Sequence, residues 1–262
     1  MDINYNAFFF PHGRRVPRGD HGMNVRFLPA GDTALVVEFG DRIDRDLSNR
    51  VLGLSALVRA SNIAGVIETV PTFRSLMVHY DPLATDSASL IAALEKLLDS
   101  NRSATKQVKL WRIPACYAIS HAPDLLDVAR RTGLSAAEVV RRHGDTRYHI
   151  YMIGFVPGFP YMGDLPESLV LPRRADPRVR VPPGSIAIAA NLTAIYPLES
   201  PGGWHLIGAT PIRLFDPRRS RPALLSAGDA VRFEPISVRE FDAIRAAVAA
   251  DTYQVPCETA AA

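Results

Sequence analysis

The segment from His149 to Gly163 holds residue types that could build a binding surface. After a strand-like run it reads Gly-Phe-Val-Pro-Gly-Phe-Pro-Tyr-Met-Gly, so glycines and prolines alternate with aromatic rings. Glycine lets a backbone approach a ligand closely, proline fixes a loop at low entropic cost, and rings supply flat apolar walls. A tightly packed barrel corner has the same composition, and the residues alone leave both interpretations open. The candidate ligand-binding residues here are Tyr151, Gly154, Phe155, Pro157, Gly158, Phe159 and Tyr161.

An arginine-rich segment follows, between prolines. Its four arginines, at positions 173, 174, 178 and 180, fall within eight residues. A guanidinium group binds a carboxylate or phosphate through two parallel hydrogen bonds. Arg173 and Arg174 are therefore candidate anion-binding residues. A solvated loop or a subunit interface is the alternative interpretation.

Four further polar or aromatic residues complete the set of candidates. Asn191 and Thr193 lie two residues apart between small apolar residues, which places them on one face of a predicted strand. If they face inward they need hydrogen-bond partners, and either a ligand or the backbone could supply them. Trp204 and His205 follow a Ser-Pro-Gly-Gly turn, on opposite faces of the next strand. Trp204 is a candidate binding residue, and His205 is the one weak candidate for an acid or base.

Several common catalytic patterns are absent from the sequence. It contains no Walker A sequence, no dinucleotide-binding glycine fingerprint, no zinc-type Cys or His spacing and no Gly-x-Ser-x-Gly elbow. We therefore expect no metal site and no self-contained catalytic signature.

The composition is that of an ordinary globular protein. The 262 residues carry a net charge of +3, from 30 basic and 27 acidic side chains, which does not favour binding to nucleic acid or to a membrane surface. No run approaches the ~18 apolar residues of a membrane helix. The two cysteines, Cys116 and Cys257, are interpreted as reduced thiols, so we expect a cytoplasmic protein.

The first part of the chain alternates strand and helix patterns. The order strand, helix, strand, strand, helix, with one more strand, is that of a ferredoxin-like α/β sandwich. We assign residues 24–100 to this domain, and we leave residues 1–22 outside the fold as a disordered tail or an overlong gene start. The predicted elements are strands at 25–28, 34–39, 65–70 and 75–80, and helices at 44–60 and 87–99.

The polar run 101–107 predicts a linker, and the pattern of predicted elements changes after it. Short strands cut by proline and glycine predict a β-barrel over residues 106–236, and residues 237–262 are predicted to form a helix and an Ala-rich tail. The fold class is therefore α+β, with a ferredoxin-like domain followed by a barrel. The predicted elements are strands at 108–113, 148–153, 185–190, 193–196, 204–207, 212–215 and 230–235, and helices at 124–131, 135–143 and 238–250.

Four motifs together resemble one known family. They are Gly31-Asp-Thr-Ala-Leu-Val-Val-Glu-Phe-Gly40, Val70-Pro-Thr-Phe-Arg-Ser-Leu-Met-Val-His-Tyr-Asp-Pro82, the run 151–163, and Tyr196-Pro-Leu-Glu-Ser-Pro-Gly-Gly-Trp-His-Leu-Ile-Gly208. In order and spacing they are similar to the family of 5-oxoprolinase B-type subunits, whose members are also named allophanate hydrolase subunit 1 or sporulation kinase-inhibitor protein. The likeness covers roughly residues 24–236.

The resemblance implies a small α/β domain followed by a cyclophilin-like barrel. It also implies a B-type subunit that is inactive alone and works with C-type and A-type subunits, using ATP (with Mg) to hydrolyse 5-oxo-L-proline to L-glutamate. The lactam is a stable amide, and phosphorylation of its oxygen would supply a leaving group. Because this chain shows no phosphate-binding loop, that step is not assigned to it.

The sequence departs from the family pattern at four positions. Where many members read Ala-Gly-Asn-Gln-Thr-Gly, this chain has alanine at 190 and 194 and leucine at 192, and His205 stands where Gln often follows the Trp. These departures bear on the substrate rather than on the fold. The alternatives to a 5-oxoprolinase subunit are a regulator that binds and inhibits a histidine kinase, and a subunit of an allophanate or urea-type amidohydrolase. A prolyl isomerase ranks last, because fold alone does not carry function.

Overall fold

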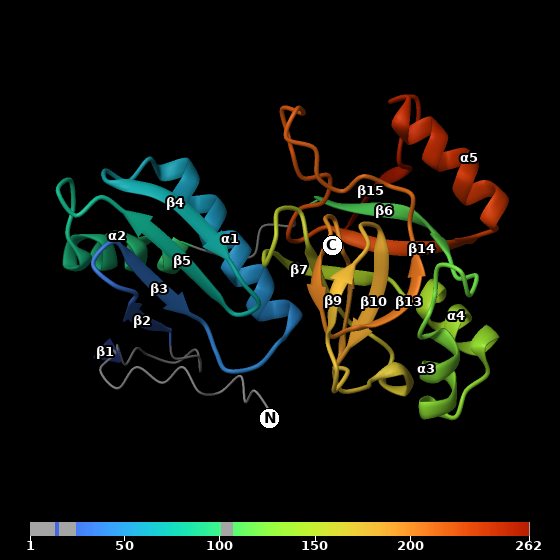
Figure 1. The fold of residues 1–262 in the computed structure, drawn as a ribbon. Coiled ribbons are helices and arrows are strands. Elements are labelled where there is room, and N and C mark those ends of the chain that lie inside the picture. Colours follow the sequence, from blue (N-terminus) through green and yellow to red (C-terminus); the bar gives the residue numbers. More distant parts are fainter. Residues whose placement is uncertain (1–13, 16–24, 101–106, 262) are drawn as a thin grey trace. The chain divides into compact units, whose positions relative to one another are not determined.

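The computed structural model describes residues 14–15, 25–100 and 107–261. The chain divides into two compact units, Met1–Ala104 and Thr105–Ala262, and each has its own sheet and its own core (Figure 1). Most of the predicted N-terminal tail lies outside the described residues. One part of it does not: the short strand β1 (Arg14–Arg15) pairs with Phe27 and Arg26. Strand pairing is made by backbone groups, so no pattern of side chains predicted it. The exclusion of all of residues 1–22 from the fold was therefore wrong for this strand.

The first unit is an antiparallel sheet with two helices. The sheet order is β1-β2-β3-β5-β4, and helix α1 connects β3 to β4 while β5 lies between them, which is a split β-α-β arrangement. The additional strand is β2, which forms a hairpin with β3, rather than a strand after α2. Asp44 caps α1 by accepting hydrogen bonds from the backbone of residues 46 and 47. The elements are β2 (Arg26–Pro29), β3 (Ala34–Glu38), α1 (Arg45–Ser61), β4 (Val66–Pro71), β5 (Ser75–Tyr80) and α2 (Ser87–Ser100).

The second unit is a closed β-barrel of seven strands. The strands follow the order β13-β10-β11-β8-β7-β14-β6, and the pairing of Ala209 with Cys116 joins β13 to β6 and closes the ring. The strands are β6 (Gln107–Cys116), β7 (Tyr148–Ile153), β8 (Pro160–Gly163), β10 (Ser185–Ala189), β11 (Leu192–Ile195), β13 (His205–Ala209) and β14 (Ala230–Ile236). The predicted α+β class, with an α/β unit before a barrel, is confirmed.

Further elements surround the barrel. Strands β9 (Arg178–Val181) and β12 (Ser200–Gly202) form a separate two-stranded ribbon. The helices are α3 (Leu125–Thr132), α4 (Ala136–Asp145), the 3-10 turn η1 (Glu167–Leu169) and α5 (Val238–Ala249). Ser135 caps α4 by accepting from the backbone N–H of Glu138, and the Glu138 carboxylate accepts from Arg141 and Arg142 instead of returning to the cap. No described helix combines the length and apolar composition needed to cross a membrane.

Two predictions for this unit were wrong. Residues 212–215 do not form a strand: Ile212 and Leu214 point into the core, but the segment makes only an isolated bridge at Phe215. The alternation of apolar residues in this segment therefore reflects the burial of their side chains, although the backbone does not pair with a neighbouring strand. The Ala-rich end is not a loose tail, because β15 (Cys257–Ala261) pairs antiparallel with β6. Small residues such as alanine have little preference for strands, so the sequence did not predict β15. The hydrogen bonds to the backbone of β6 hold this segment in place instead.

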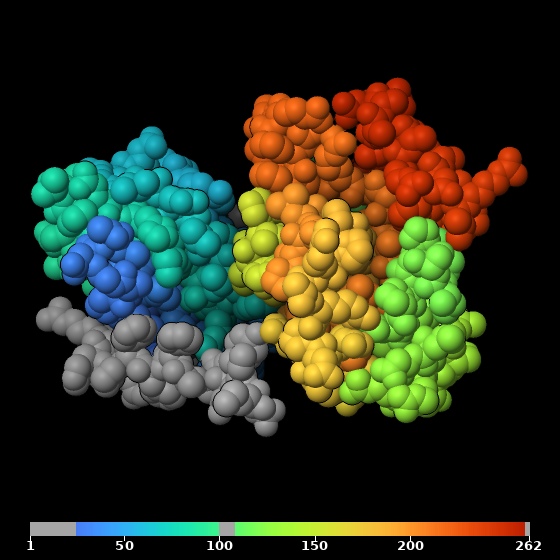
Figure 2. Space-filling model, viewed as in Figure 1, coloured from blue at the N-terminus to red at the C-terminus, as the bar shows by residue number. Residues whose placement is uncertain are grey.

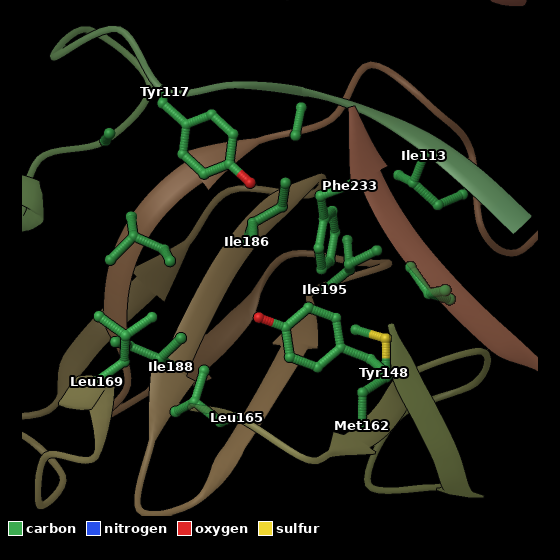
Figure 3. Close-up of a cluster of buried hydrophobic side chains, with 14 of the residues drawn as sticks. Ile113, Tyr117, Tyr148, Met162, Leu165, Leu169, Ile186, Ile188, Ile195 and Phe233 are labelled. Carbon is green, nitrogen blue, oxygen red and sulfur yellow. The ribbon is translucent and has the colours of Figure 1, made fainter. Parts of the chain in front are cut away.

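The barrel interior is filled mainly by branched and aromatic side chains. Alternate residues of each strand point inward, as Ile186 and Ile188 do on β10, and they belong to one buried cluster with Phe233 of β14 (Figure 3). Two tyrosines, Tyr117 and Tyr148, also point inward and bring their hydroxyl groups into this apolar interior. Such hydroxyls need partners, which the next subsection identifies.

Candidate functional site

An aromatic cluster covers the outer face of the barrel strands β8, β10, β11 and β13. It consists of Phe159, Tyr161, Tyr196 and Trp204, packed over the small residues of β10 and β11. The ring centroids of Phe159 lie 4.9 Å from Tyr161, 5.1 Å from Tyr196 and 6.1 Å from Trp204. Edge-on and tilted contacts of this kind stabilise aromatic groups beyond their burial. The structure thus brings three sequence-predicted residues together and adds Tyr196.

Two glycines let the aromatic rings settle on this face. A Cβ atom at Gly202 would lie 2.2 Å from the Tyr196 hydroxyl, and one at Gly163 would lie 2.3 Å from the Tyr151 ring. Any larger side chain would push these rings away. Tyr151 is buried and contacts His149 edge-on at 4.6 Å, so it extends the same outer layer toward β7. Burial raises the pKa of Tyr196 to about 12, so its hydroxyl stays protonated at neutral pH.

The loop between β7 and β8 presents one aromatic ring to solvent. Phe155 is 62% exposed and has a φ of +70°, a left-handed conformation that is uncommon for a bulky residue. Gly158, at φ +79°, packs against Phe215, and Pro157 is exposed between them. The backbone N–H of Gly154 donates to the carbonyl oxygen of Phe159 across the loop. The loop is therefore held closed by its own backbone, with the Phe155 ring 5.6 Å from Phe159 at its edge.

The arginine-rich segment is fastened to the barrel by one buried aspartate. Asp124 accepts from Arg174 Nη1 at 3.0 Å and from Arg178 Nη2 at 2.7 Å, and its other oxygen accepts from the backbone N–H of Leu206 at 2.7 Å. The Arg173 side chain instead lies over the Trp204 ring, with its Cζ atom 5.9 Å from the ring centroid. The yellow surface of the second unit in Figure 2 includes this part of the chain. Arg174 thus has a structural partner, and Arg173 joins the aromatic cluster.

Thr193 lies on the opposite, inner face of the same strands. Its hydroxyl donates to the carbonyl oxygen of Ala187 at 3.1 Å and lies 2.9 Å from His143 Nε2. The Tyr117 hydroxyl lies 2.8 Å from His143 Nδ1, and the Tyr148 hydroxyl donates to the His143 carbonyl oxygen. Every donor has an acceptor when Tyr117 donates to Nδ1 and the Nε2–H group donates to Thr193. Thr193 therefore belongs to a sealed hydrogen-bond chain, and burial lowers the pKa of His143 to about 3.

Asn191 and His205 also lie apart from the aromatic cluster. Asn191 is exposed in the two-residue turn between β10 and β11, so it shares no strand face with Thr193. His205 is fully buried, with Nε2 2.9 Å from the carbonyl oxygen of Pro172 and 3.5 Å from Arg131 Nη1. Its Nδ1 atom is buried without a hydrogen-bond partner among the described residues. A histidine enclosed in this way holds the start of the arginine-rich segment in place.

Sequence reasoning missed the residues that organise the site from a distance. Asp124 looked like the first residue of a helix, yet it makes no side-chain cap and turns its carboxylate to the arginines. His143 ended a predicted helix and carried no motif. Arg174 lies 50 positions from Asp124, and Thr193 lies 50 positions from His143, so only the closed barrel reveals these contacts. Among the described residues, no group of three His, Cys, Asp or Glu side chains is placed to hold a metal ion.

Comparison with known proteins identifies first a class and then a family. The family model of the carboxyltransferase domain, subdomains C and D, matches residues 25–225, which places the chain in that class. Urea amidolyase from Kluyveromyces lactis shares the fold, with a TM-score of 0.78 at 19% identity, over 95% of this chain and 17% of that one. The solved structure of TTHA0988 has a TM-score of 0.70 at 34% identity, and this chain spans only 40% of its length.

Within this class, the chain belongs to the family of 5-oxoprolinase B-type subunits. It is 35% identical to the 5-oxoprolinase B-type subunit of Bacillus subtilis (strain 168), over 85% of this chain and 98% of that protein. It is 39% identical to the corresponding B-type subunit of Escherichia coli O157:H7, over 78% of this chain and 93% of that protein. The family predicted from the four sequence motifs is confirmed.

Proposed function

We propose that this chain is the B-type subunit of an ATP-dependent 5-oxoprolinase, which opens 5-oxo-L-proline to L-glutamate together with C-type and A-type subunits. The observation that carries this proposal is the similarity to two B-type subunits over nearly their whole length. The chain is inactive alone in this proposal. In support, the histidines His143 and His205 are both buried and engaged in hydrogen bonds within the barrel unit.

ATP supplies the leaving group in the proposed reaction. The terminal phosphoryl group of ATP moves to the lactam oxygen and leaves ADP. Water then adds to the activated carbon, and the ring C–N bond breaks as the amine takes up a proton, which leaves an acyl phosphate of glutamate. A second water hydrolyses this acyl phosphate to L-glutamate and inorganic phosphate. Magnesium accompanies the nucleotide and offsets its negative charge. We place none of these steps on a residue of this chain. Its contribution is the outer aromatic face with Arg173, which can hold a compact anionic ring against a partner subunit.

The test is reconstitution from purified subunits. The chain is mixed with the A-type and C-type subunits, Mg-ATP and 5-oxo-L-proline, and glutamate and ADP are measured together. We expect both products from the full mixture, and neither from the chain alone or from the mixture without it. A complete mixture of folded subunits that forms no glutamate would refute the proposal.

Variants of the chain connect that activity to the outer face. Arg173→Ala is expected to raise the KM for 5-oxoproline at least several-fold, because it removes the cation above Trp204. The matched control is Arg141→Ala, an exposed arginine of α4 that pairs with Glu138. Its kinetics should not change, and equal losses in both variants would exclude a special role for Arg173.

A urea-type amidohydrolase is the second candidate. It is favoured by the 24% identity to urea amidolyase of Lachancea kluyveri over 83% of this chain, although that match spans only 14% of the yeast protein. The leucine at position 192 and the histidine at 205 also fit a changed ligand. Allophanate in place of 5-oxoproline in the same mixture separates the two candidates through ammonia release. We also propose a cytoplasmic location, in keeping with two free thiols at Cys116 and Cys257.

A further inference from the structure

The barrel unit also contains a groove whose charged lining residues are all basic. This groove of about 710 Å³ is lined by the connection from β9 to β10, the segment after β13 and helix α5. Among the described residues that line the groove, none contributes a ring to the aromatic cluster, and Leu206 alone packs with that cluster. The basic lining residues are His121, Arg178, Arg180, Arg213 and Arg245, and no Asp or Glu occurs among the described residues that line the groove.

Two of the lining arginines are already neutralised. Arg180 makes a two-pronged contact with Glu199, at 3.0 Å from Nε and 2.8 Å from Nη2. Arg245 pairs with Asp242 at 2.9 Å. Each of these is one cation against one carboxylate, so neither adds net charge to the groove.

The other two arginines each share an aspartate with a second arginine. Arg178 shares Asp124 with Arg174, and Arg213 shares Asp216 with Arg218. Both aspartates are buried, and each accepts at least three hydrogen bonds. Each arginine–aspartate–arginine group therefore carries one excess positive charge. The neighbouring Arg219 pairs with Asp251 and leaves this balance unchanged.

Both groove arginines retain unused donors. A guanidinium group has five N–H donors, and Arg178 and Arg213 each give one hydrogen bond to their aspartate. The Nη1 atom of Arg178 is buried and has no acceptor among the described residues. A buried charged donor without an acceptor is costly, so the Arg178 guanidinium group is under-paired in this structure. Its side chain is 24% exposed and lines the groove, where an anion can add to its single ion pair.

We propose that this groove binds a small dianion with two acidic groups on a short apolar scaffold, one group facing Arg178 and the other facing Arg213. Ile212, Phe215 and Phe241 add apolar surface to the same lining. The volume lies in the range of small-molecule sites. L-Glutamate offers two carboxylates on a short chain, together with one ammonium group, and its assignment as the physiological occupant rests on the proposed function. A diphosphate presents the same charge pattern, so the test includes both sources.

Calorimetry on the full chain at low ionic strength tests this proposal directly. Glutarate, with two carboxylates, is compared with butyrate, which has one, and with inorganic pyrophosphate. We expect glutarate to bind at least tenfold more tightly than butyrate. Arg178→Gln and Arg213→Gln should each weaken glutarate binding about tenfold and remove its advantage over butyrate. Competition by L-glutamate against glutarate assigns the dicarboxylate source, and tight pyrophosphate binding without such competition assigns the phosphate source.

Two sets of control variants separate this site from general surface charge. Arg180→Gln and Arg245→Gln remove neutralised lining arginines and should change affinity less than twofold. Arg174→Gln and Arg218→Gln remove arginines outside the lining, yet each cancels one excess charge and should weaken glutarate binding several-fold. Circular dichroism checks that every variant folds.

Three outcomes would overturn the proposal: equal binding of glutarate and butyrate, equal losses in the Arg180 and Arg178 variants, or no binding of any of these anions at millimolar concentration. Because these titrations use the chain alone, failed reconstitution of 5-oxoprolinase activity would leave their result unaffected.

Discussion

The inner and outer faces of strands β10, β11 and β13 carry different kinds of interaction, although they belong to the same backbone. On the inner face, polar groups such as Thr193 and His143 satisfy one another in an enclosed hydrogen-bond chain. On the outer face, rings pack against rings, and arginines outnumber the aspartates that hold them. Neighbouring residues such as Trp204 and His205 fall on opposite faces. A shift of one position along a strand thus separates residues that build the barrel from residues that can meet a ligand.

The largest effect should follow from removing Asp124, which fastens the outer face. Asp124→Ala leaves Arg174 and Arg178 without their carboxylate and Leu206 N–H without an acceptor. We expect the free energy of unfolding to fall by about 3–5 kcal/mol, as for a broken buried ion pair. Both tryptophans, Trp111 and Trp204, lie in the barrel unit, so their fluorescence in urea reports its unfolding.

The matched control for Asp124 is Asp127→Ala, one turn along α3. Asp127 pairs with Arg130 and Arg131 at the surface, and its loss should leave the urea midpoint almost unchanged. Equal losses in the two variants would show that the outer face is not held by a buried aspartate.

Acid should weaken the inner face through His143. Its pKa is lowered to about 3 by burial, against an ordinary value of 6.5, so between these values the unfolded chain binds a proton that the folded chain does not. Stability contributed by the neutral ring is present above pH 6.5 and is lost as the pH falls. Each pH unit costs about 1.4 kcal/mol, so we expect about 2 kcal/mol between about pH 6.5 and pH 5.

Variants assign this pH dependence to one residue. His143→Gln should lower stability at neutral pH but flatten its decline in acid, whereas Tyr117→Phe keeps the histidine and should keep the slope. Urea midpoints at several pH values give the comparison. An unchanged slope in the His143 variant would place the acid sensitivity elsewhere.

A smaller loss should follow from cutting the inner chain at Thr193. Thr193→Val keeps the shape but leaves His143 Nε2–H without its acceptor and removes the side-chain hydrogen bond to the Ala187 carbonyl oxygen. We expect a loss of about 1–2 kcal/mol, with no change in the KM of the reconstituted enzyme. Thr252→Val, at an exposed hydroxyl that bonds the end of α5, is the control and should change little. A raised KM for Thr193→Val alone would contradict the separation of the two faces.

The sequence predicted the elements well and the contacts between them less well. Helices such as α1 and α4, and strands with clear alternation, depend on residues that are neighbours in the sequence, so local patterns were sufficient to predict them. Strand β15 and the Asp124 contacts depend on partners far along the chain, which no local pattern encodes. The predicted site residues fall into two groups for the same reason, because their positions depend on contacts far along the chain. Phe159, Tyr161, Trp204 and Arg173 meet, whereas Thr193 falls on the inner face because barrel closure fixes which residues point inward.

The smallest expected effect concerns Ala190, in the turn that links β10 to β11. Ala190 has a φ of +51°, a left-handed conformation that favours glycine, which is also the residue that the family resemblance implies at this position. Ala190→Gly should relieve this strain, and the greater freedom of glycine in the unfolded chain offsets part of the gain. We expect a net stabilisation of about 0.5 kcal/mol, measured by the tryptophan signal in urea. Ala189→Gly, one residue earlier in the buried strand, is the control and should destabilise the barrel, because no positive φ is relieved there. If Ala190→Gly lowers stability as much as that control, the turn is not strained, and alanine at 190 needs an explanation in the contacts of the outer face.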